Sequence, residues 1–333
     1  MRCPSFVKIL LELSLECESL ARSEAMSAAK ALDGDPILLH KEPGIVVMDT
    51  SADPVALAGR LGLCHFVSEW LESCAQNDLE KRAGRLDVPG PIRIRSTKVG
   101  EKALDLATIS RRVGAVVGKS RGVDLHNPAS DIRIVFSGIA HIGRVISAID
   151  RSSFEARKNR YLPFVYPASL HPKFARALVN LTQVRAGQTL LDPFCGTGAI
   201  VAEASMVGLN ARGTDVAEKM IEGARQNLSH LGLKADLRES DVGDISRTVT
   251  SAKGIATDPP YGRSTSTDGE AIPDLYERAF SAFAAVLGKS DRVAMVVPDV
   301  DLLDGADGFK LLEKHELWVH RSLTRHFCVL EKR

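Results

Sequence analysis

Regular alternation between two kinds of segment, from residue 189 to residue 299, is the feature that most constrains the fold of this chain. The segments TLLDPFCGTG, NARGTDV, KADLRESDV, KGIATDPPYG and DRVAMVVPD begin as short apolar runs typical of buried strands. The segments between them have apolar residues at helical spacing. Strands that alternate with crossover helices form a parallel sheet with helices on both faces. The end of the chain, ELWVHRSLTRHFCVLEK, predicts two strands joined by a short turn. We therefore predict an α/β, doubly wound domain closed by an antiparallel hairpin.

Four of the predicted strands end in an aspartate. These residues are Asp192, Asp215, Asp241 and Asp258. In doubly wound sheets, ligands bind beyond the carboxyl ends of the strands. Each carboxylate alone is explained by an ordinary turn or helix cap. Their repetition on four consecutive strands instead predicts a binding site.

A glycine-rich turn follows the first of these strands and limits the choice of ligand. Gly196 and Gly198 allow the backbone to approach a ligand, and the next helix offers free N–H groups. A dinucleotide fingerprint needs a glycine where this chain has Val201, and a phosphate-binding lysine is absent from the turn. Asp215 can accept hydrogen bonds from ribose hydroxyls and Asp241 from an adenine amino group. The acids therefore favour a cationic nucleoside, and S-adenosylmethionine fits because its sulfonium is attracted to carboxylates.

The fourth strand ends in the motif Asp258–Pro259–Pro260–Tyr261. An exocyclic amine of a nucleobase is a poor nucleophile, so an enzyme must hold it against the methyl group and draw its hydrogens out of the ring plane with hydrogen-bond acceptors. The Asp258 carboxylate and the Pro259 carbonyl are the two predicted acceptors, and the prolines stiffen the turn. The Tyr261 ring can stack on an extruded base, a contact worth about 1–3 kcal/mol. The alternative reading is an ordinary tight turn at a strand exit.

The N-terminal half has a different organisation. Residues 6–73 follow a β-α-β-β-α-β rhythm, which predicts a ferredoxin-like α+β arrangement. The formal charge of the chain is only +1, yet eight basic residues and two acids lie between Gly90 and Arg121. The basic residues are Arg93, Arg95, Lys98, Lys102, Arg111, Arg112, Lys119 and Arg121. This cluster predicts a local phosphate-contacting surface. An ordinary solvated helix face is the alternative.

Six cysteines are scattered without a CxxC pair, which argues against a zinc site and a disulfide framework. No metal site is predicted, and free thiols fit a reducing cytosol. No uninterrupted apolar stretch is long enough to span a membrane, and no signal peptide is recognised. We therefore expect a cytoplasmic protein. His315, His320 and His326 are expected to be ordinary surface residues.

Several of these motifs resemble a known family. The segments DPPY and DPFCGTG resemble amino-group methyltransferases that use S-adenosylmethionine. The longer stretches ATDPPYGRSTSTDGE, LLDPFCGTGAIVAEA and YPASLHPKFARALVNLT are similar to the archaeal and eukaryotic tRNA guanosine-10 N2-methyltransferases. The N-terminal half resembles the ferredoxin-like segment and THUMP domain of that family, and VDLHNPASDIRIVFSG matches the THUMP strand pattern. The resemblance covers nearly the whole chain.

The resemblance implies a domain order and a set of site residues. The domains are a ferredoxin-like segment at 1–50, a THUMP RNA-binding domain at 51–150, a linker at 151–166 and a Rossmann-like class I methyltransferase domain at 167–333. Asp258, Pro259, Pro260 and Tyr261 hold the guanine. The expected cofactor contacts are Ser169, His171, Asp192, Phe194, Gly196, Thr197, Gly198, Asp215, Val216, Asp241 and Val242. The expected RNA contacts are Arg93, Arg95, Lys98, Arg111, Arg112, Lys119, Arg121, Arg157 and Arg160. The implied partners are tRNA and, as in some family members, a small zinc-binding activator subunit.

Three functions remain open at this point. The first is N2-methylation of a tRNA guanosine, once or twice. The second is methylation of another exocyclic amine, in ribosomal RNA or on adenine N6. The third is a non-catalytic RNA-binding protein, although such a protein has no physical reason to keep an acid on each of four strands.

Overall fold

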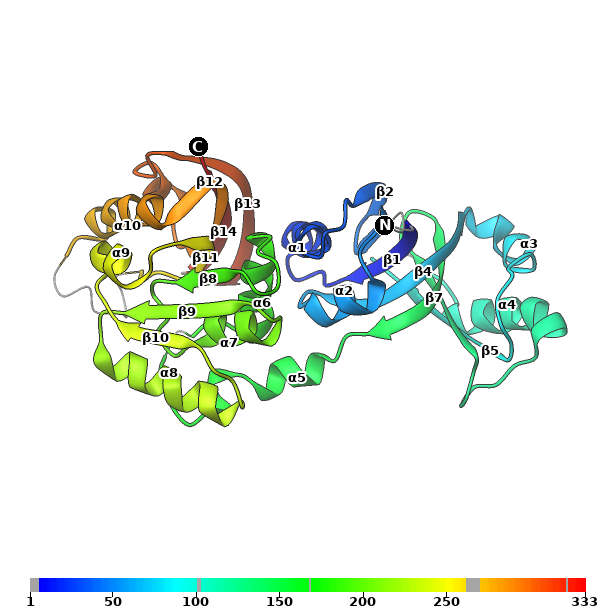
Figure 1. Ribbon diagram of the computed structural model, residues 1–333. Helices are drawn as coiled ribbons and strands as arrows, with labels where there is room; N and C mark the ends of the chain where they lie inside the picture. The colour runs from blue at the N-terminus through cyan, green and yellow to red at the C-terminus, as the bar shows by residue number, and fades with distance from the viewer. Residues whose placement is uncertain (1–5, 101–102, 168, 262–269, 322) are drawn as a thin grey trace, which may run out of the picture. The chain divides into compact units, whose positions relative to one another are not determined.

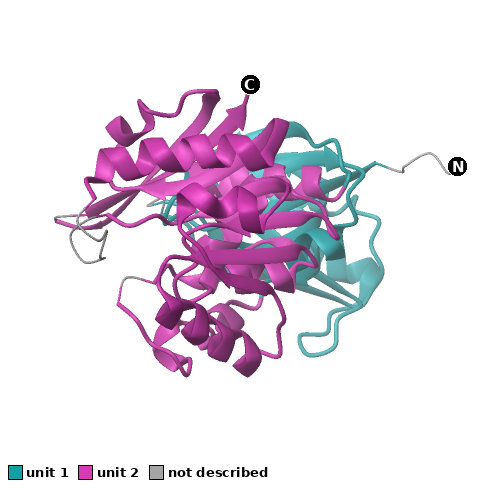
Figure 2. Ribbon diagram, turned by 60° about the vertical axis from the view of Figure 1, so that its left-hand side comes forward, with its two compact units in different colours: residues 1–18, 33–59, 64–149 teal, residues 19–32, 60–63, 150–333 magenta. Residues whose placement is uncertain are grey.

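The chain forms two compact units, and the computed structural model describes residues 6–100, 103–167, 169–261, 270–321 and 323–333. The first unit contains the residues up to 18 together with 33–59 and 64–149. The second unit contains 19–32, 60–63 and 150–333 (Figure 2). Each unit is built around a seven-stranded sheet.

The sheet of the first unit has the strand order β2-β3-β1-β4-β7-β6-β5 (Figure 1). Its strands are β1 (Val7–Leu13), β2 (Ile37–Glu42), β3 (Ile45–Thr50), β4 (Cys64–Cys74), β5 (Ile92–Lys98), β6 (Ser130–Phe136) and β7 (Ala140–Ala148). The first four strands pair antiparallel in the order β2-β3-β1-β4, which confirms the predicted ferredoxin-like arrangement. A boundary after residue 50 falls inside this arrangement, because β4 pairs with β1.

The helices in this part of the sequence are α1 (Glu18–Ala31), α2 (Pro54–Arg60), α3 (Leu79–Ala83) and α4 (Leu106–Arg121). The helices α3 and α4 pack on the β4, β5, β6 and β7 part of this sheet and form a hydrophobic cluster with it, whereas most of α1 belongs to the second unit. Asp105 caps α4 by accepting a 3.0 Å hydrogen bond from the Thr108 N–H. Val113 and Val117 of α4 pack in one cluster with Ile132 of β6. β5 pairs parallel with β6, so the sheet as a whole is mixed.

The sheet of the second unit has the order β10-β9-β8-β11-β12-β14-β13. Its strands are β8 (Thr189–Asp192), β9 (Asn210–Asp215), β10 (Asp236–Glu239), β11 (Ala252–Thr257), β12 (Leu287–Val297), β13 (Phe309–His320) and β14 (Leu323–Lys332). The first five strands are parallel, and β14 pairs antiparallel with β12 and β13. The predicted doubly wound sheet with a closing hairpin is confirmed. Strand order reverses between β8 and β11, which is where such sheets bind ligands.

Helices cover both faces of this second sheet (Figure 1). On one side lie α6 (Pro172–Leu181), α7 (Ala199–Met206) and α8 (Glu218–His230), and on the other lie α9 (Ile245–Thr248) and α10 (Ile272–Val286). Tyr276, Phe280 and Phe283 of α10 form a buried cluster with Val293 and Met295 of β12. Within the described residues, no helix combines the length and the apolar character that crossing a membrane requires.

Two N-terminal segments, 19–32 and 60–63, belong to the second unit through a buried polar network. The Glu24 carboxylate of α1 accepts hydrogen bonds from the Gly62 and Leu63 N–H groups, both at 2.8 Å. It also accepts one from Asn180 of α6 at 2.9 Å, and Arg60 donates to the Asn180 side-chain oxygen at 2.9 Å. Burial raises the pKa of Glu24 to about 7 against these hydrogen bonds.

The predicted linker is also packed onto the second unit. It begins with α5 (Arg151–Ala156), and its later part lies against α8. The Asn227 side chain accepts from the Phe164 N–H at 2.9 Å and donates to the Phe164 carbonyl at 3.0 Å. The expectation that His315 is a surface residue is wrong, because it is buried and its Nδ1 lies 3.0 Å from the Ser19 hydroxyl.

Candidate active site

A cavity of about 540 Å³ lies at the carboxyl edge of the second sheet. Its lining includes the four predicted strand-terminal acids, Asp192, Asp215, Asp241 and Asp258. Ligand pockets in proteins commonly have volumes of about 300–1,000 Å³, so a nucleoside cofactor and a base fit this space. The alternation of strands and helices therefore brings together residues that are up to 66 positions apart.

Asp192 is the most buried of these acids, with 1% of its surface exposed. It accepts hydrogen bonds from the Thr257 hydroxyl at 2.8 Å and from the Phe194 N–H at 3.2 Å. Burial raises the pKa of Asp192 to about 7, and the nearby charges of Asp258 and Asp215 add to this effect. A cation in the cavity would favour the ionised carboxylate, so this environment suits a positively charged ligand.

Asp215 fixes the glycine-rich turn to the end of β9. Its two carboxylate oxygens accept from the Gly196 and Ala217 N–H groups, each at 3.0 Å. Gly196 and Gly198 have φ values of 48° and 84°, in the left-handed region that favours glycine. Burial raises the pKa of Asp215 despite the two N–H donors. Asp215 thus fixes the glycine-rich turn at the cavity, and its oxygens can still accept hydrogen bonds from a ligand.

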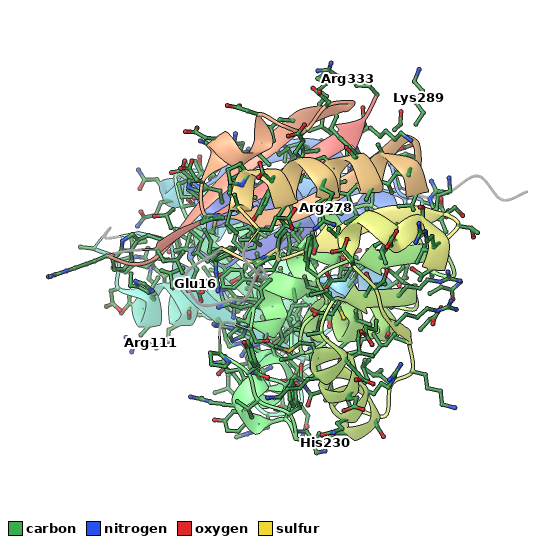
Figure 3. The ribbon with its side chains drawn as sticks, turned by 90° about the vertical axis from the view of Figure 1, so that its left-hand side faces the viewer. Glu16, Arg111, His230, Arg278, Lys289 and Arg333 are labelled. Carbon is green, nitrogen blue, oxygen red and sulfur yellow. The ribbon has the colours of Figure 1, made fainter. Side chains whose placement is uncertain are left out.

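Asp241 is part of an ion-pair chain on the other side of the cavity. Arg278 of α10, labelled in Figure 3, donates to Asp241 and also to both oxygens of Glu270, at 3.0 and 2.7 Å. The Gly243 N–H donates to the same Asp241 oxygen at 2.8 Å. Burial alone would raise the pKa of Asp241, but the hydrogen bonds from Arg278 and Gly243 hold it below the ordinary value. Asp241 is therefore an ionised acceptor in a fixed orientation.

Asp258 and Tyr261 both line the cavity and bond to each other. The Tyr261 hydroxyl donates to Asp258 Oδ1 at 2.5 Å. Burial raises the pKa of Asp258 to about 6, against the opposing charge of Arg325 and the hydrogen bond from Tyr261. Pro259 and Pro260 line the cavity between them. The motif thus presents a carboxylate, a stiff backbone ridge and a phenol ring to the same space as the other three acids.

Nine of the eleven residues predicted to contact the cofactor line this cavity. They are Ser169, Asp192, Phe194, Gly196, Thr197, Asp215, Val216, Asp241 and Val242. The Ser169 and Thr197 hydroxyls lie 2.9 Å apart, which joins the segment before α6 to the glycine-rich turn.

The structure places the other two, His171 and Gly198, outside this lining. His171 caps α6 by accepting from the Lys173 N–H at 3.2 Å, and its Nε2 lies 3.1 Å from Glu155. Gly198 is the N-cap residue before α7, and a Cβ there would lie 3.2 Å from the side chain of Ala224. We therefore revise both assignments: these residues shape the segments that reach the cavity.

Comparison with known proteins follows the same division of the chain. The family described as an RMKL-like methyltransferase domain matches residues 159–326. The tRNA (guanine(10)-N2)-dimethyltransferase of Methanothermobacter thermautotrophicus is 33% identical over 98% of this chain and 100% of its own length. This chain belongs to the tRNA (guanine(10)-N2)-dimethyltransferase family.

Two further similarities support the family assignment and the fold. The family member of Pyrococcus abyssi with the same description is 32% identical over 94% of this chain and 96% of its own length. The crystal structure of TrmN from Thermus thermophilus is 24% identical and has a TM-score of 0.57, covering 98% of this chain and 100% of that one. At this identity the likeness shows the fold alone. It nevertheless extends over both units of this family member.

The basic residues expected to contact RNA are mostly engaged in ion pairs. Arg93 and Arg95 both pair with Asp131, the former at 2.7 Å. Arg112 pairs with Glu80 at 2.6 Å and Arg121 with Asp87 at 2.8 Å, and Arg111 donates to the Thr108 hydroxyl at 2.9 Å. Lys98 and Lys119 are exposed. The acidic partners lie outside residues 90–121, so a count within that window overstated the net positive charge.

Arg157 and Arg160 of the connector have different surroundings. Arg157 donates to both oxygens of Glu203, at 2.9 and 3.3 Å, in a pair whose side chains are 13% and 2% exposed. Arg176 joins the same carboxylate at 2.7 Å. The prediction that Arg157 contacts RNA is therefore withdrawn, since it neutralises a buried acid. Arg160 is exposed and lies 4.7 Å from the centre of the Tyr161 ring.

Two charged residues of the cavity lining were missed from the sequence. Glu270 and Arg278 lie before and within α10 and carry no motif that marks them. The available signal was weak: an arginine on the helix that follows the Asp258 motif, with an acid eight residues before it. Among the described residues, no group of three or more potential ligands could hold a metal ion.

Proposed function

We propose that this protein transfers methyl groups from S-adenosylmethionine to the exocyclic N2 of guanosine 10 in tRNA, forming N2-methyl- and then N2,N2-dimethylguanosine. The activity assigned by name to relatives that match nearly the full chain supports this proposal. The observation that carries it is that Asp258 and Tyr261 line the same cavity as Asp192, Asp215 and Asp241. A base held by the first pair would therefore lie beside a cofactor held by the other three.

The residues of the cavity fit S-adenosylmethionine along its length. The glycine-rich turn and Asp192 would receive the methionine end, where buried carboxylates attract the sulfonium. Asp215 would accept the ribose hydroxyls, and the ionised Asp241 would accept the adenine amino group. When bound, the cofactor supplies an electrophilic methyl group.

The Asp258 motif would position the guanine amine for attack. The Asp258 carboxylate and the Pro259 carbonyl accept the two amine hydrogens, which directs the nitrogen lone pair out of the ring plane. Tyr261 orients Asp258 through its hydroxyl and offers its ring to the base. Transfer of the methyl group to the guanine nitrogen would make that nitrogen acidic. Asp258, with a pKa of about 6, can take the released proton.

The N-terminal residues would bind the tRNA. We assign the residues through β4 to the ferredoxin-like segment and those from the end of β4 to residue 150 to a THUMP domain, since β4 pairs with β1. Residues 151–166 are the linker and 167–333 the methyltransferase domain. Lys98, Lys119 and Arg160, which are exposed, are the favoured phosphate contacts among the predicted residues. A tRNA substrate and the five free cysteines of the described chain support a cytoplasmic location.

The test incubates the purified chain with an unmodified tRNA transcript and methyl-labelled cofactor, followed by mass spectrometry of the nucleosides. We expect N2,N2-dimethylguanosine, and no product on a matched transcript with adenosine at position 10. Label on adenosine would favour another exocyclic amine as the target. No label, with or without a small zinc-binding activator subunit, would favour a non-catalytic RNA-binding protein. Turnover by the chain alone would remove the need for that partner.

A further inference from the structure

The hairpin formed by β13 and β14 rises beyond the edge of the sheet that carries the active site. β12 ends at Val297, which pairs with His326 of β14. β14 begins three residues earlier, at Leu323, and β13 continues to His320. At about 3.3 Å per residue, the hairpin extends roughly 10 Å past the end of β12. Asp258 follows β11, whose Thr257 pairs with Met295 of β12, so the hairpin overhangs the same edge.

The part of the hairpin beyond this edge has an unusual composition. We define the hairpin tip as residues 318–321 and 323–325. Between Glu316 and Glu331 the sequence contains no acid, and the tip carries Arg321 and Arg325. Trp318 is 69% exposed, the largest exposure of any large hydrophobic residue in the described chain. The register shifts between Trp318 and His320, an irregularity of the kind that re-aims side chains near active sites.

The hairpin tip is electrostatically close to the Asp258 motif. Arg325 lowers the pKa of Asp258 and that of Tyr261 through its positive charge. Its Nε is buried and has no hydrogen-bond partner within the described residues. Arg321 is exposed, and the described part of the chain offers it no ion-pair partner. The tip therefore adds the exposed positive charge of Arg321 beside the place where a nucleobase would enter, while the charge of Arg325 acts on Asp258.

An exposed tryptophan near the exposed Arg321 matches the chemistry of a nucleic-acid strand. Aromatic rings stack on bases without regard to sequence, and arginines contact phosphates. A protein partner or a second copy of the chain would gain from the apolar ring but not from the excess positive charge. Charge complementarity thus favours a polyanion as the occupant.

We propose that the hairpin tip binds the RNA strand beside the target guanosine, with Trp318 stacked on a neighbouring base and Arg321 on a phosphate. This inference rests on the proposed function and adds a second point of attachment, within the catalytic unit itself. Such a contact would help to hold the target guanosine extruded at the Asp258 motif.

Kinetics of tip variants provide the first test. Trp318→Ala should raise KM for tRNA by about fivefold to a hundredfold, the range expected for loss of one stacked base. Trp318→Phe should restore most of the affinity, and Arg321→Gln should raise KM and weaken its salt dependence. KM for the cofactor should not change. Leu311→Ala, which truncates another exposed apolar residue at the far end of β13, is the matched control and should behave as wild type.

Fluorescence provides a second, independent test, because the chain has only two tryptophans, Trp70 and Trp318. In the Trp70→Phe variant all tryptophan emission comes from Trp318, and tRNA should quench it with a saturating dependence. Unchanged emission together with an unchanged KM for tRNA in Trp318→Ala would overturn the inference, provided that the wild type methylates tRNA. A change in oligomeric state of Trp318→Ala with normal tRNA kinetics would also overturn it, in favour of a protein contact. Absence of wild-type turnover would count against the proposed function instead.

Discussion

Replacing Asp258 with asparagine isolates the chemical role of the carboxylate. The substitution preserves shape, and the amide oxygen can still accept the 2.5 Å hydrogen bond from Tyr261. The amide nitrogen then faces the incoming guanine amine, so an acceptor is replaced by a donor where an amine hydrogen must be held. Loss of one such oriented group costs about 2.7–4 kcal/mol, which lowers kcat about a hundredfold to a thousandfold. Cofactor affinity should change by less than about tenfold, because Asp192, Asp215 and Asp241 remain.

The assay separates chemistry from binding. Single-turnover methylation with saturating tRNA and cofactor gives the rate of the chemical step, and calorimetry gives the dissociation constant of the cofactor. Tyr261→Phe is the control variant, since it keeps the ring and removes only the hydroxyl; we expect a rate loss of about tenfold. A wild-type rate for Asp258→Asn would refute the assigned role. Loss of cofactor binding in that variant would mean that Asp258 belongs to the cofactor site.

Three further outcomes follow from the charges of the second unit. Because Asp192 has a pKa raised to about 7, the affinity for the sulfonium cofactor should rise by up to about tenfold from about pH 6 to about pH 8. The affinity for the demethylated product, which lacks the sulfonium charge, should depend less on pH when both are measured by calorimetry. Arg278→Ala should raise KM for the cofactor about tenfold with kcat nearly unchanged, and Arg278→Lys should recover only part of this, because lysine cannot hold Asp241 and Glu270 together. Glu24 has a folded pKa of about 7, above its ordinary value of 4.5, so its contribution to stability is lost as pH rises through 7. The free energy of unfolding of wild type should therefore fall by about 2 kcal/mol more between about pH 5.5 and about pH 8 than that of Glu24→Gln, as measured by chemical denaturation. An equal fall in both proteins would contradict this account.

Local patterns were sufficient to predict the catalytic half. The alternation of strands and helices fixes which ends of the strands meet, so the convergence of Asp192, Asp215, Asp241 and Asp258 follows from sequence order alone. The glycine turn was equally readable, because its positive φ angles restrict the choice of residue. The same reasoning predicted the antiparallel hairpin of β13 and β14, whose alternation differs from that of the buried parallel strands.

What escaped prediction depends on partners distant in sequence. Arg278 reaches Asp241 across 37 positions, and no motif announces the pair. The cationic character of residues 90–121 was overstated because Asp131 and Glu80 neutralise part of it from neighbouring elements. His171 lies in a segment that resembles cofactor-binding segments of the family, but its side chain is used to cap a helix. Tertiary pairing of this kind is set by the fold and leaves little trace in composition.

The membership of residues 19–32 and 60–63 in the second unit has a consequence for how such a protein can change over generations. A recombination event at the junction near residue 150 would separate Glu24 and Arg60 from Asn180, to which both are bonded. In the resulting chimera, the buried acid of one parent would face a helix of the other parent that need not offer it a hydrogen-bond donor. The free energy of unfolding would then fall by several kcal/mol. The catalytic half and the N-terminal half are therefore expected to be inherited together, with substitutions at positions 24, 60 and 180 occurring in combination. Exchange of either half alone between enzymes is expected to be rare.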